Sequence, residues 1–315
     1  MQTLLSMFLK INTEQVVDTV KINFDTEGLW VLNITLAIIM FGVALGITLA
    51  DFKRLFKNPK IVLVGIFSQF VLFPMITFLL VNIINPTPSI ALGMIMVAAC
   101  PGGNISNFMT QLSGGNAGLS VSLTAFATLV AVLMTPINLS FWGNLYEPTA
   151  EILRTVQLDP FELVKLVSLI LGIPLLLGMI VRNRKPDLAS KISKFLKPFS
   201  IFIFLVFIII AFYDNLDIFT KYIHYVFFIV ILHNFSGYLG GFYFAKAMRL
   251  SYFDQKTLAL ETGIQNSGLG LLLVFAFFEG LGGMALCVAF WGIWDIVSGL
   301  GLAYFWSKKT AKITA

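Results

Sequence analysis

The sequence predicts an all-α polytopic membrane protein of about nine transmembrane helices, two of them broken near their centres. Of the 315 residues, 58% are hydrophobic and 12% are charged, and the mean hydropathy is +0.90. Soluble proteins average about a quarter charged residues. The basic residues gather between the apolar stretches, and two of these stretches carry a Gly-containing polar cluster, at 101–107 and 261–268. These three observations together indicate a membrane bundle with two interrupted spans.

Each apolar stretch is close to the roughly 20 residues that a transmembrane helix needs. We expect spans at 30–50, 61–81, 89–112, 117–141, 162–181, 198–213, 222–245, 257–279 and 284–306. Residues 1–29 carry too many charges for a span and do not resemble a signal peptide, so they predict an N-terminal interfacial arm. The chain then divides into this arm, a single transmembrane domain at 30–306 and a tail at 307–315. Cys100 and Cys287 lie within apolar stretches and are expected to be small core residues.

The basic residues predict the orientation of the chain. Sixteen of the 21 fall in four groups, at 53–60, 182–197, 246–256 and 308–312, which a nine-span chain places on one side of the membrane. The other side receives mainly acids. Because basic loops stay in the cytoplasm, the N-terminus is expected outside and the C-terminus inside. The net charge of +5 is therefore a topology signal and does not indicate nucleic-acid binding.

The run E-T-G-I-Q-N-S-G at 261–268 places a carboxylate, two amides and two hydroxyls at membrane depth. Gly263 and Gly268 beside them predict an unwound segment that faces protein or water. An ionisable residue such as Glu261 within a span indicates a functional site. Broken spans in corresponding positions of two halves are typical of transporters with inverted repeats, whose site lies at the crossing. Helix kinks in a bundle core are the alternative, but they explain neither Glu261 nor the repetition.

Three motifs resemble the bile acid:sodium symporter family. They are C-P-G-G at 100–103 followed by Ser106-Asn107, L-H-N at 232–234, and E-x-G-x-Q-N-S-G at 261–268, in order within 30–306. The resemblance implies an inverted-repeat fold of the sodium/proton-antiporter type, with a panel domain and a core domain that contains two crossing broken helices. This chain would lack the first of the family's ten helices. The resemblance also implies a transporter domain at 30–306 that imports an organic anion, bile-acid-like or a small carboxylate, by sodium symport and alternating access. Two sodium ions would be the coupling ions, with no other cofactor.

The family's sodium ligands carry over to this sequence as two sets that share Glu261. The first set would be Ser106, Asn107, Ser120, Thr124 and Glu261, and the second the side chains of Gln69, Glu261 and Gln265 with the carbonyls of Thr262 and Ile264. All of these groups bear oxygen, which hard cations prefer. Taken singly, Gln69, Ser120 or Thr124 would be an ordinary interhelical hydrogen-bond partner.

The resemblance places the anion beside the broken helices, with Asn104, Asn266 and the half-helix ends as candidate contacts. Asp295 departs from the family, in which related sequences often carry a His-Asn pair after a Trp. It is either a cavity residue, where it would repel an anion, or a core acid with a hydrogen-bond partner. His233 is expected to be a packed structural histidine rather than a proton relay.

Other functional classes fit the sequence less well. A sodium/proton antiporter could use Glu261 with Asp295, although it usually has an acid pair at the crossing. A membrane enzyme would need a nucleophile-base or metal constellation, and none stands out in the sequence. A non-transporting receptor would bind ligand without flux. The expected partners are an organic anion, sodium ions and the lipid bilayer, without nucleic acid. The short loops are consistent with a bacterial inner membrane, and an organelle envelope is the alternative location.

Overall fold

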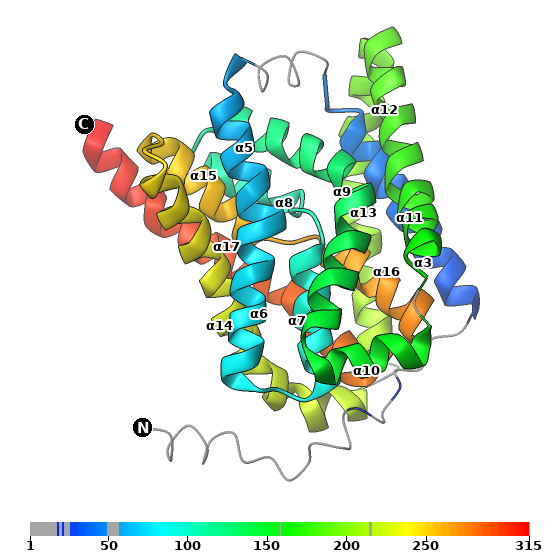
Figure 1. Cartoon of the computed structure of the whole chain (residues 1–315). Coiled ribbons are helices and arrows are strands. Elements are labelled where there is room, and N and C mark those ends of the chain that lie inside the picture. The colour runs from blue at the N-terminus through cyan, green and yellow to red at the C-terminus, as the bar shows by residue number, and fades with distance from the viewer. Residues whose placement is uncertain are drawn as a thin grey trace.

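The computed structural model describes residues 18, 21, 26–48, 57–157, 159–213 and 216–314, and most of them lie in helices of one bundle (Figure 1). The expected N-terminal arm lies outside these residues, except for Asp18, Lys21 and the first turn of the first helix described.

Fourteen α-helices and two π-helical turns follow one another along the described chain. They are α3 (Thr26–Ala44), α5 (Pro59–Phe67), the π-helical turn η1 (Ser68–Leu72), α6 (Phe73–Ile84), α7 (Pro88–Ala99), α8 (Ile105–Leu112), α9 (Ala117–Leu145), α10 (Glu147–Val156), α11 (Pro160–Val167), the π-helical turn η2 (Ser168–Gly172), α12 (Ile173–Arg184), α13 (Pro186–Tyr213), α14 (Leu216–Ala247), α15 (Tyr252–Gly263), α16 (Ser267–Phe278) and α17 (Gly282–Thr314).

Five helical stretches of the described chain are long and apolar enough to cross a membrane. They are Pro59–Ile84, Ala117–Leu145, Pro160–Arg184, Leu216–Ala247 and Gly282–Lys308. Shorter apolar helices cover Asn33–Ala44, Pro88–Ala99 and Ser267–Phe278. The count of nine spans is therefore not confirmed by length and composition. One reason is that α7 and α16, with 12 residues each, rise by only about 18 Å at 1.5 Å per residue, short of a hydrocarbon core of about 30 Å.

Two helix boundaries and one extra helix differ from the sequence expectation. α13 begins at Pro186, well before the expected 198, and α9 continues to Leu145. The early turns of α13 expose Lys191 and Lys194, so this helix extends beyond its apolar part, and hydropathy does not detect such an extension. The short α10 lies where a loop was expected and begins at a Glu-Pro pair, which is favourable in a first helical turn.

The two ends of the bundle are occupied by different connections (Figure 1). The start of α5, the α12–α13 junction, the α14–α15 junction and the end of α17 lie at one end. The α6–α7, α9–α10 and α16–α17 connections, the end of α13 and the start of α14 lie at the other. The described parts of the four basic groups thus belong to elements that meet at one end of the bundle.

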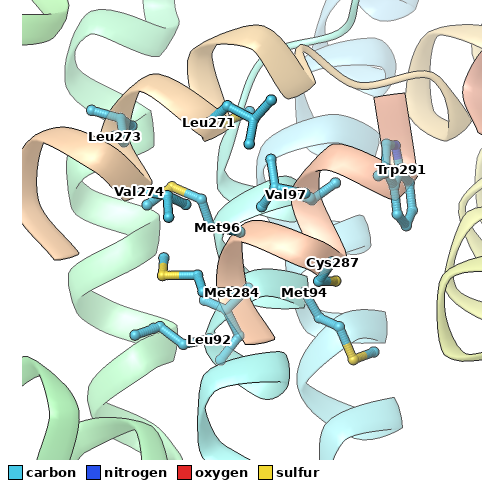
Figure 2. Close-up of a cluster of buried hydrophobic side chains, with 14 of the residues drawn as sticks. Leu92, Met94, Met96, Val97, Leu271, Leu273, Val274, Met284, Cys287 and Trp291 are labelled. Atoms are coloured by element: carbon cyan, nitrogen blue, oxygen red, sulfur yellow. The ribbon is translucent and has the colours of Figure 1, made fainter. Parts of the chain in front are cut away.

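The largest hydrophobic core joins α7, α16 and α17 (Figure 2). All residues of α7 from Ser89 to Ala99 are buried, as expected for a helix that is apolar all round. The labelled core side chains are Leu92, Met94, Met96 and Val97 of α7, Leu271, Leu273 and Val274 of α16, and Met284, Cys287 and Trp291 of α17. Both cysteines are buried free thiols, in agreement with their expected place in the core. This core fixes the lower half of the bundle in Figure 1, beneath the interrupted segments.

Close backbone packing holds α15 against α14. A Cβ atom added at Gly241 would lie 2.6 Å from the Leu258 carbonyl oxygen, and one at Gly237 would lie 3.2 Å from the Thr262 carbonyl oxygen. Small residues four positions apart permit such an approach in membrane bundles. The half-helix that carries Glu261 is thereby packed tightly against a long helix.

Candidate functional site

The two broken helices cross where their helical hydrogen bonding stops, and their backbones pair there. One break separates α7 from α8, and the other separates α15 from α16. The backbone N–H of Gly103 donates to the Ile264 carbonyl oxygen at 3.0 Å, and that of Asn266 donates to the Pro101 carbonyl oxygen at 2.8 Å. The interruptions therefore satisfy each other's polar backbone groups, as membrane depth requires.

The crossing leaves no room for a side chain in the first break. A Cβ atom at Gly103 would lie 2.8 Å from the Gln265 carbonyl oxygen. One at Gly102 would lie 2.8 Å from Gln69 Nε2 and 3.1 Å from the Glu261 carbonyl oxygen. Both glycines are required by this close approach, which brings Gln69 and Glu261 to the same point.

Two polar side chains complete the backbone bonding of the second break. Asn234 Nδ2 donates to the Gly263 carbonyl oxygen at 2.8 Å and to Asp295 Oδ1 at 3.0 Å. The backbone N–H of Gln265 donates to Asp295 Oδ2 at 3.0 Å. The motif at 232–234 includes Asn234, but sequence reasoning gave it no structural role. In the fold, α14 and α17 supply these two residues to hold the unwound segment.

The structure brings together all five residues of the first predicted sodium set. Ser106 donates to Glu261 Oε1 at 2.6 Å, Ser120 donates to the same oxygen, and Thr124 donates to Oε2 at 2.8 Å. Asn107 Oδ1 lies 2.8 Å from the Ser120 hydroxyl and 3.2 Å from that of Thr124. Residues from α8, α9 and α15 thus converge on one carboxylate that is 4% exposed.

Oxygen atoms are crowded around the Glu261 carboxylate. Three hydroxyl groups make six O···O contacts, one of them between the Thr124 hydroxyl and the Ser120 carbonyl oxygen at 3.0 Å. Each hydroxyl has one proton to donate, so these protons are shared between contacts and oxygen lone pairs face one another around the carboxylate. A bound cation would turn these facing lone pairs into ligands, and the arrangement therefore suits a hard cation.

The residues of the second predicted set lie at the crossing, and both glutamines have a side-chain atom without a hydrogen-bond partner in the described chain. Gln69 is buried in η1, and its Nε2 has no hydrogen-bond partner among the described residues. Gln265 Nε2 donates to the Thr262 carbonyl oxygen at 2.8 Å, while its Oε1 has no such partner. The Ile264 carbonyl oxygen already accepts from the first break. The Gln265 side-chain oxygen is therefore available to a cation while the amide nitrogen holds the Thr262 carbonyl.

The π-helical turn η1 orients Gln69 and involves residues that sequence reasoning missed. Pro74 has no N–H for the carbonyl four residues earlier, which belongs to Phe70, and Asn138 Nδ2 donates to that carbonyl at 3.0 Å. Ser68 and Thr262 are joined through their hydroxyls at 2.8 Å. π-Helical turns occur often at functional sites. Pro74 within an expected span was the signal that could have indicated this irregularity.

The candidate anion contacts occupy different environments. Asn104 precedes the first residue of α8, and Asn266 caps α16 by accepting from the Leu269 N–H at 3.1 Å. Both are only partly buried, at helix N-termini that favour negative charge. Asp295 is 3% exposed, and donors occupy both of its oxygens. Of the two alternatives for Asp295, this geometry supports the core acid.

His233 lies inside an aromatic cluster. Its Nε2 donates to the Thr77 hydroxyl at 2.6 Å, and that hydroxyl donates to the Phe73 carbonyl oxygen at 2.8 Å. The ring stacks on Phe73 with centroids 4.9 Å apart and meets Trp291 edge-on at 4.6 Å. These contacts are those of a packed structural histidine.

The acids are arranged differently from a metalloenzyme or an acid-pair site. In the described part of the chain, no three His, Cys, Asp or Glu side chains lie close enough to hold a metal ion. Glu261 is surrounded by hydroxyls, and Asp295 by an amide and a backbone N–H. The two acids therefore belong to separate hydrogen-bond groups.

Comparison with known proteins places the chain in a family. Residues 33–222 match the model of the sodium bile acid symporter family. The chain is 34% identical over 293 residues to a Bacillus subtilis protein named "Uncharacterized sodium-dependent transporter YocS", covering 92% of this chain and 88% of that protein. It is 30% identical over 241 residues to the human ileal sodium/bile acid cotransporter, covering 76% and 67%. It is 27% identical over 290 residues to the Arabidopsis thaliana protein "Probable sodium/metabolite cotransporter BASS1, chloroplastic", covering 92% and 69%.

The fold is shared with a solved antiporter. The sodium proton antiporter MjNhaP1 from Methanocaldococcus jannaschii superposes with a TM-score of 0.50 over 98% of this chain and 91% of that one. Because the sequence identity is 14%, this likeness concerns the fold alone. The relatives in sequence are sodium-dependent transporters and not enzymes. The chain is thus an integral membrane protein that belongs to the sodium bile acid symporter family.

Proposed function

We propose that this protein is a sodium-coupled symporter that imports an organic anion by alternating access. The observation that carries the proposal is the convergence of hydroxyl, amide and carboxylate oxygens from three helices around Glu261. The first sodium ion would be held there by Ser106, Asn107, Ser120, Thr124 and Glu261. Membership of a sodium-dependent family supports the choice of sodium as the cation.

The second sodium ion would bind on the other side of the same carboxylate. Its ligands would be the side chains of Gln69, Glu261 and Gln265 and the carbonyls of Thr262 and Ile264. Broken helices commonly coordinate cations through such carbonyls. Gln265 would coordinate through Oε1, which has no hydrogen-bond partner among the described residues, and Gln69 would coordinate through its own side-chain oxygen. This binding would draw η1 and the crossing together.

The anion would bind beside the crossing at the N-termini of α8 and α16. These ends carry partial positive charge, and Asn104 and Asn266, which precede the two helices, would be the polar contacts. A bile-acid-like anion or a small carboxylate fits this chemistry. Names of the relatives support both classes, because they include a bile acid cotransporter and a protein called a metabolite cotransporter. Sodium would bind first, since it offsets the charge of Glu261 before an anion enters.

Two sodium ions with one monovalent anion would carry one net positive charge inward. Uptake would then gain about 2.3 kcal/mol per 100 mV of inside-negative potential. The protein is expected to reside in a cell membrane of the bacterial type. The end of the bundle that carries the basic groups would face the cytoplasm. The N-terminus would be outside and the C-terminus inside.

Uptake into proteoliposomes tests this proposal. The purified protein is reconstituted, and labelled taurocholate and pyruvate are offered under an inward sodium gradient or an equal potassium gradient. Sodium-dependent uptake that slows when the potential is dissipated is the expected result. Equal uptake in both gradients would contradict sodium coupling, and sodium-dependent uptake that ignores the potential would contradict the two-to-one stoichiometry alone.

Sodium/proton antiport through Glu261 and Asp295 is a weaker candidate. The antiporter likeness supports the fold only, and the two acids bind separate partners. A sodium gradient that acidifies or alkalises the vesicle interior in the absence of any organic anion would favour antiport over symport.

A further inference from the structure

Lys256 is a buried cation that the proposed transport mechanism does not use. It lies in the second turn of α15 and is 0% exposed. Its Nζ donates to the carbonyl oxygens of Ser113 and Gly114, at 2.7 and 2.8 Å. The same ammonium lies over the rings of Tyr252 and Phe253, at 5.2 and 5.3 Å from their centroids. A buried charge with this many favourable contacts is firmly held in place.

The two carbonyls belong to the turn that joins α8 to α9. α8 ends at Leu112 and is followed by Gly114 in the left-handed region at φ 66°. The N–H groups of Gly114 and Gly115 close the helix on the carbonyls of Gln111 and Thr110, at 3.1 and 2.9 Å. This closure satisfies the preceding carbonyls of α8. The ammonium of Lys256 satisfies the carbonyls of Ser113 and Gly114, which follow the helix end. A cation is also favoured at the negative end of a helix.

α15 also holds the other end of the same turn, through Asp254 and Thr257. Asn116 Nδ2 donates to Asp254 at 2.9 Å, and the Asn116 backbone N–H donates to the Thr257 hydroxyl at 2.9 Å. Asn116 also caps α9 by accepting from the Leu119 N–H at 3.1 Å. One side of α15 thus fastens the end of α8 and the start of α9 together.

These contacts lie close to the proposed cation site. Lys256 is five residues before Glu261 on α15, or about 7.5 Å along the helix at 1.5 Å per residue. α8 carries Ser106, and α9 carries Ser120 and Thr124, so all three elements of the site meet at the turn as well as at the carboxylate. Fixing the turn limits how far the hydroxyls of α8 and α9 can move from Glu261.

We infer that Lys256 is a positioning residue for the Glu261 cation site, because it holds the α8–α9 turn on α15 and so sets the spacing of the proposed ligands. This inference rests on the proposed function. Thr257 supports the same attachment through Asn116. Neither Lys256 nor Thr257 is itself a proposed ligand.

The test is a sodium titration of purified protein at constant ionic strength, with Tm shifts converted to Kd. Lys256→Met keeps the length of the side chain and removes its donors, Lys256→Arg restores donors, and Lys246→Met removes an exposed lysine on α14 as the matched charge control. We expect Lys256→Met to weaken sodium binding by about tenfold, Lys256→Arg to recover part of this loss, and Lys246→Met to match wild type.

Two further variants separate positioning from general destabilisation. Leu92→Ala removes volume from the core of Figure 2, so it should lower Tm and leave the sodium Kd unchanged. Thr257→Val, which keeps the shape of its side chain, should weaken sodium binding and decides the question if Lys256→Met does not fold. Wild-type Kd in both Lys256→Met and Thr257→Val, or a Kd that rises equally in Leu92→Ala, would overturn the inference. Absence of a sodium response in wild type would instead overturn the proposed function.

Discussion

Replacing Gly103 by Ala perturbs the crossing at the point where the two breaks touch. The new Cβ would lie 2.8 Å from the Gln265 carbonyl oxygen, while ordinary contact begins near 3.4 Å. The segments must therefore separate by about 0.6 Å if the methyl group is to fit. The bond from the Gly103 N–H to Ile264, now 3.0 Å long, would stretch beyond the hydrogen-bonding range.

Overpacking of this kind costs about 1–3 kcal/mol, and a lost hydrogen bond adds about 0.5–1.5 kcal/mol. Gly103→Ala should thus lower the free energy of unfolding by about 1.5–4.5 kcal/mol, summed from these terms. It should also weaken sodium binding, because the Ile264 carbonyl moves. Thermal unfolding followed by tryptophan fluorescence, with and without sodium, measures both effects.

Gly301→Ala is the matched control. No atom lies within 4 Å of a Cβ atom at Gly301, which is in the interior of α17. Alanine should be neutral there or stabilise by about 0.5–1 kcal/mol. If Gly103→Ala unfolds at the wild-type temperature and keeps the wild-type sodium response, the close pairing of the two breaks is wrong.

Two further substitutions probe the support of the crossing. Asn138→Leu removes the donor to the Phe70 carbonyl beside Gln69, and we expect a loss of about 1–3 kcal/mol in thermal unfolding; an unchanged Tm would contradict this role. Asp295→Ala removes the acceptor of the Gln265 N–H and should destabilise by about 1–3 kcal/mol while anion selectivity in uptake assays stays as in wild type. A changed preference between taurocholate and pyruvate would instead place Asp295 in the anion site.

The sequence predicts the parts of the site that combine polar groups with apolar surroundings. Glu261 between glycines in an apolar segment indicates an unwound functional span without any structure. The first sodium set came from the resemblance, and the fold brings its five residues together although they are spread from 106 to 261 along the chain. The spacing of these residues in the sequence could not predict that they converge, because contacts between α8, α9 and α15 depend on tertiary packing.

Residues whose side chains hydrogen-bond to backbone carbonyls could not be identified from the sequence. Asn138 and Lys256 look ordinary in the sequence, since their partners are carbonyls exposed by a proline and by a helix end. Periodicity detects buried faces but does not indicate which carbonyl lacks a partner. Helix ends were similarly missed in α13, whose exposed lysines continue the helix past its apolar part.

The binding of sodium at Glu261 is the central claim, and one measurement tests it most directly. The Tm of purified wild type and of Glu261→Ala is followed against sodium concentration, with choline holding the ionic strength constant. A ligand that binds only the folded state stabilises it by RT ln(1 + [L]/Kd). The account predicts a rise in wild-type Tm that is specific to sodium and absent in Glu261→Ala. A wild-type Tm that responds equally to sodium and choline, or a rise that Glu261→Ala retains in full, would contradict it.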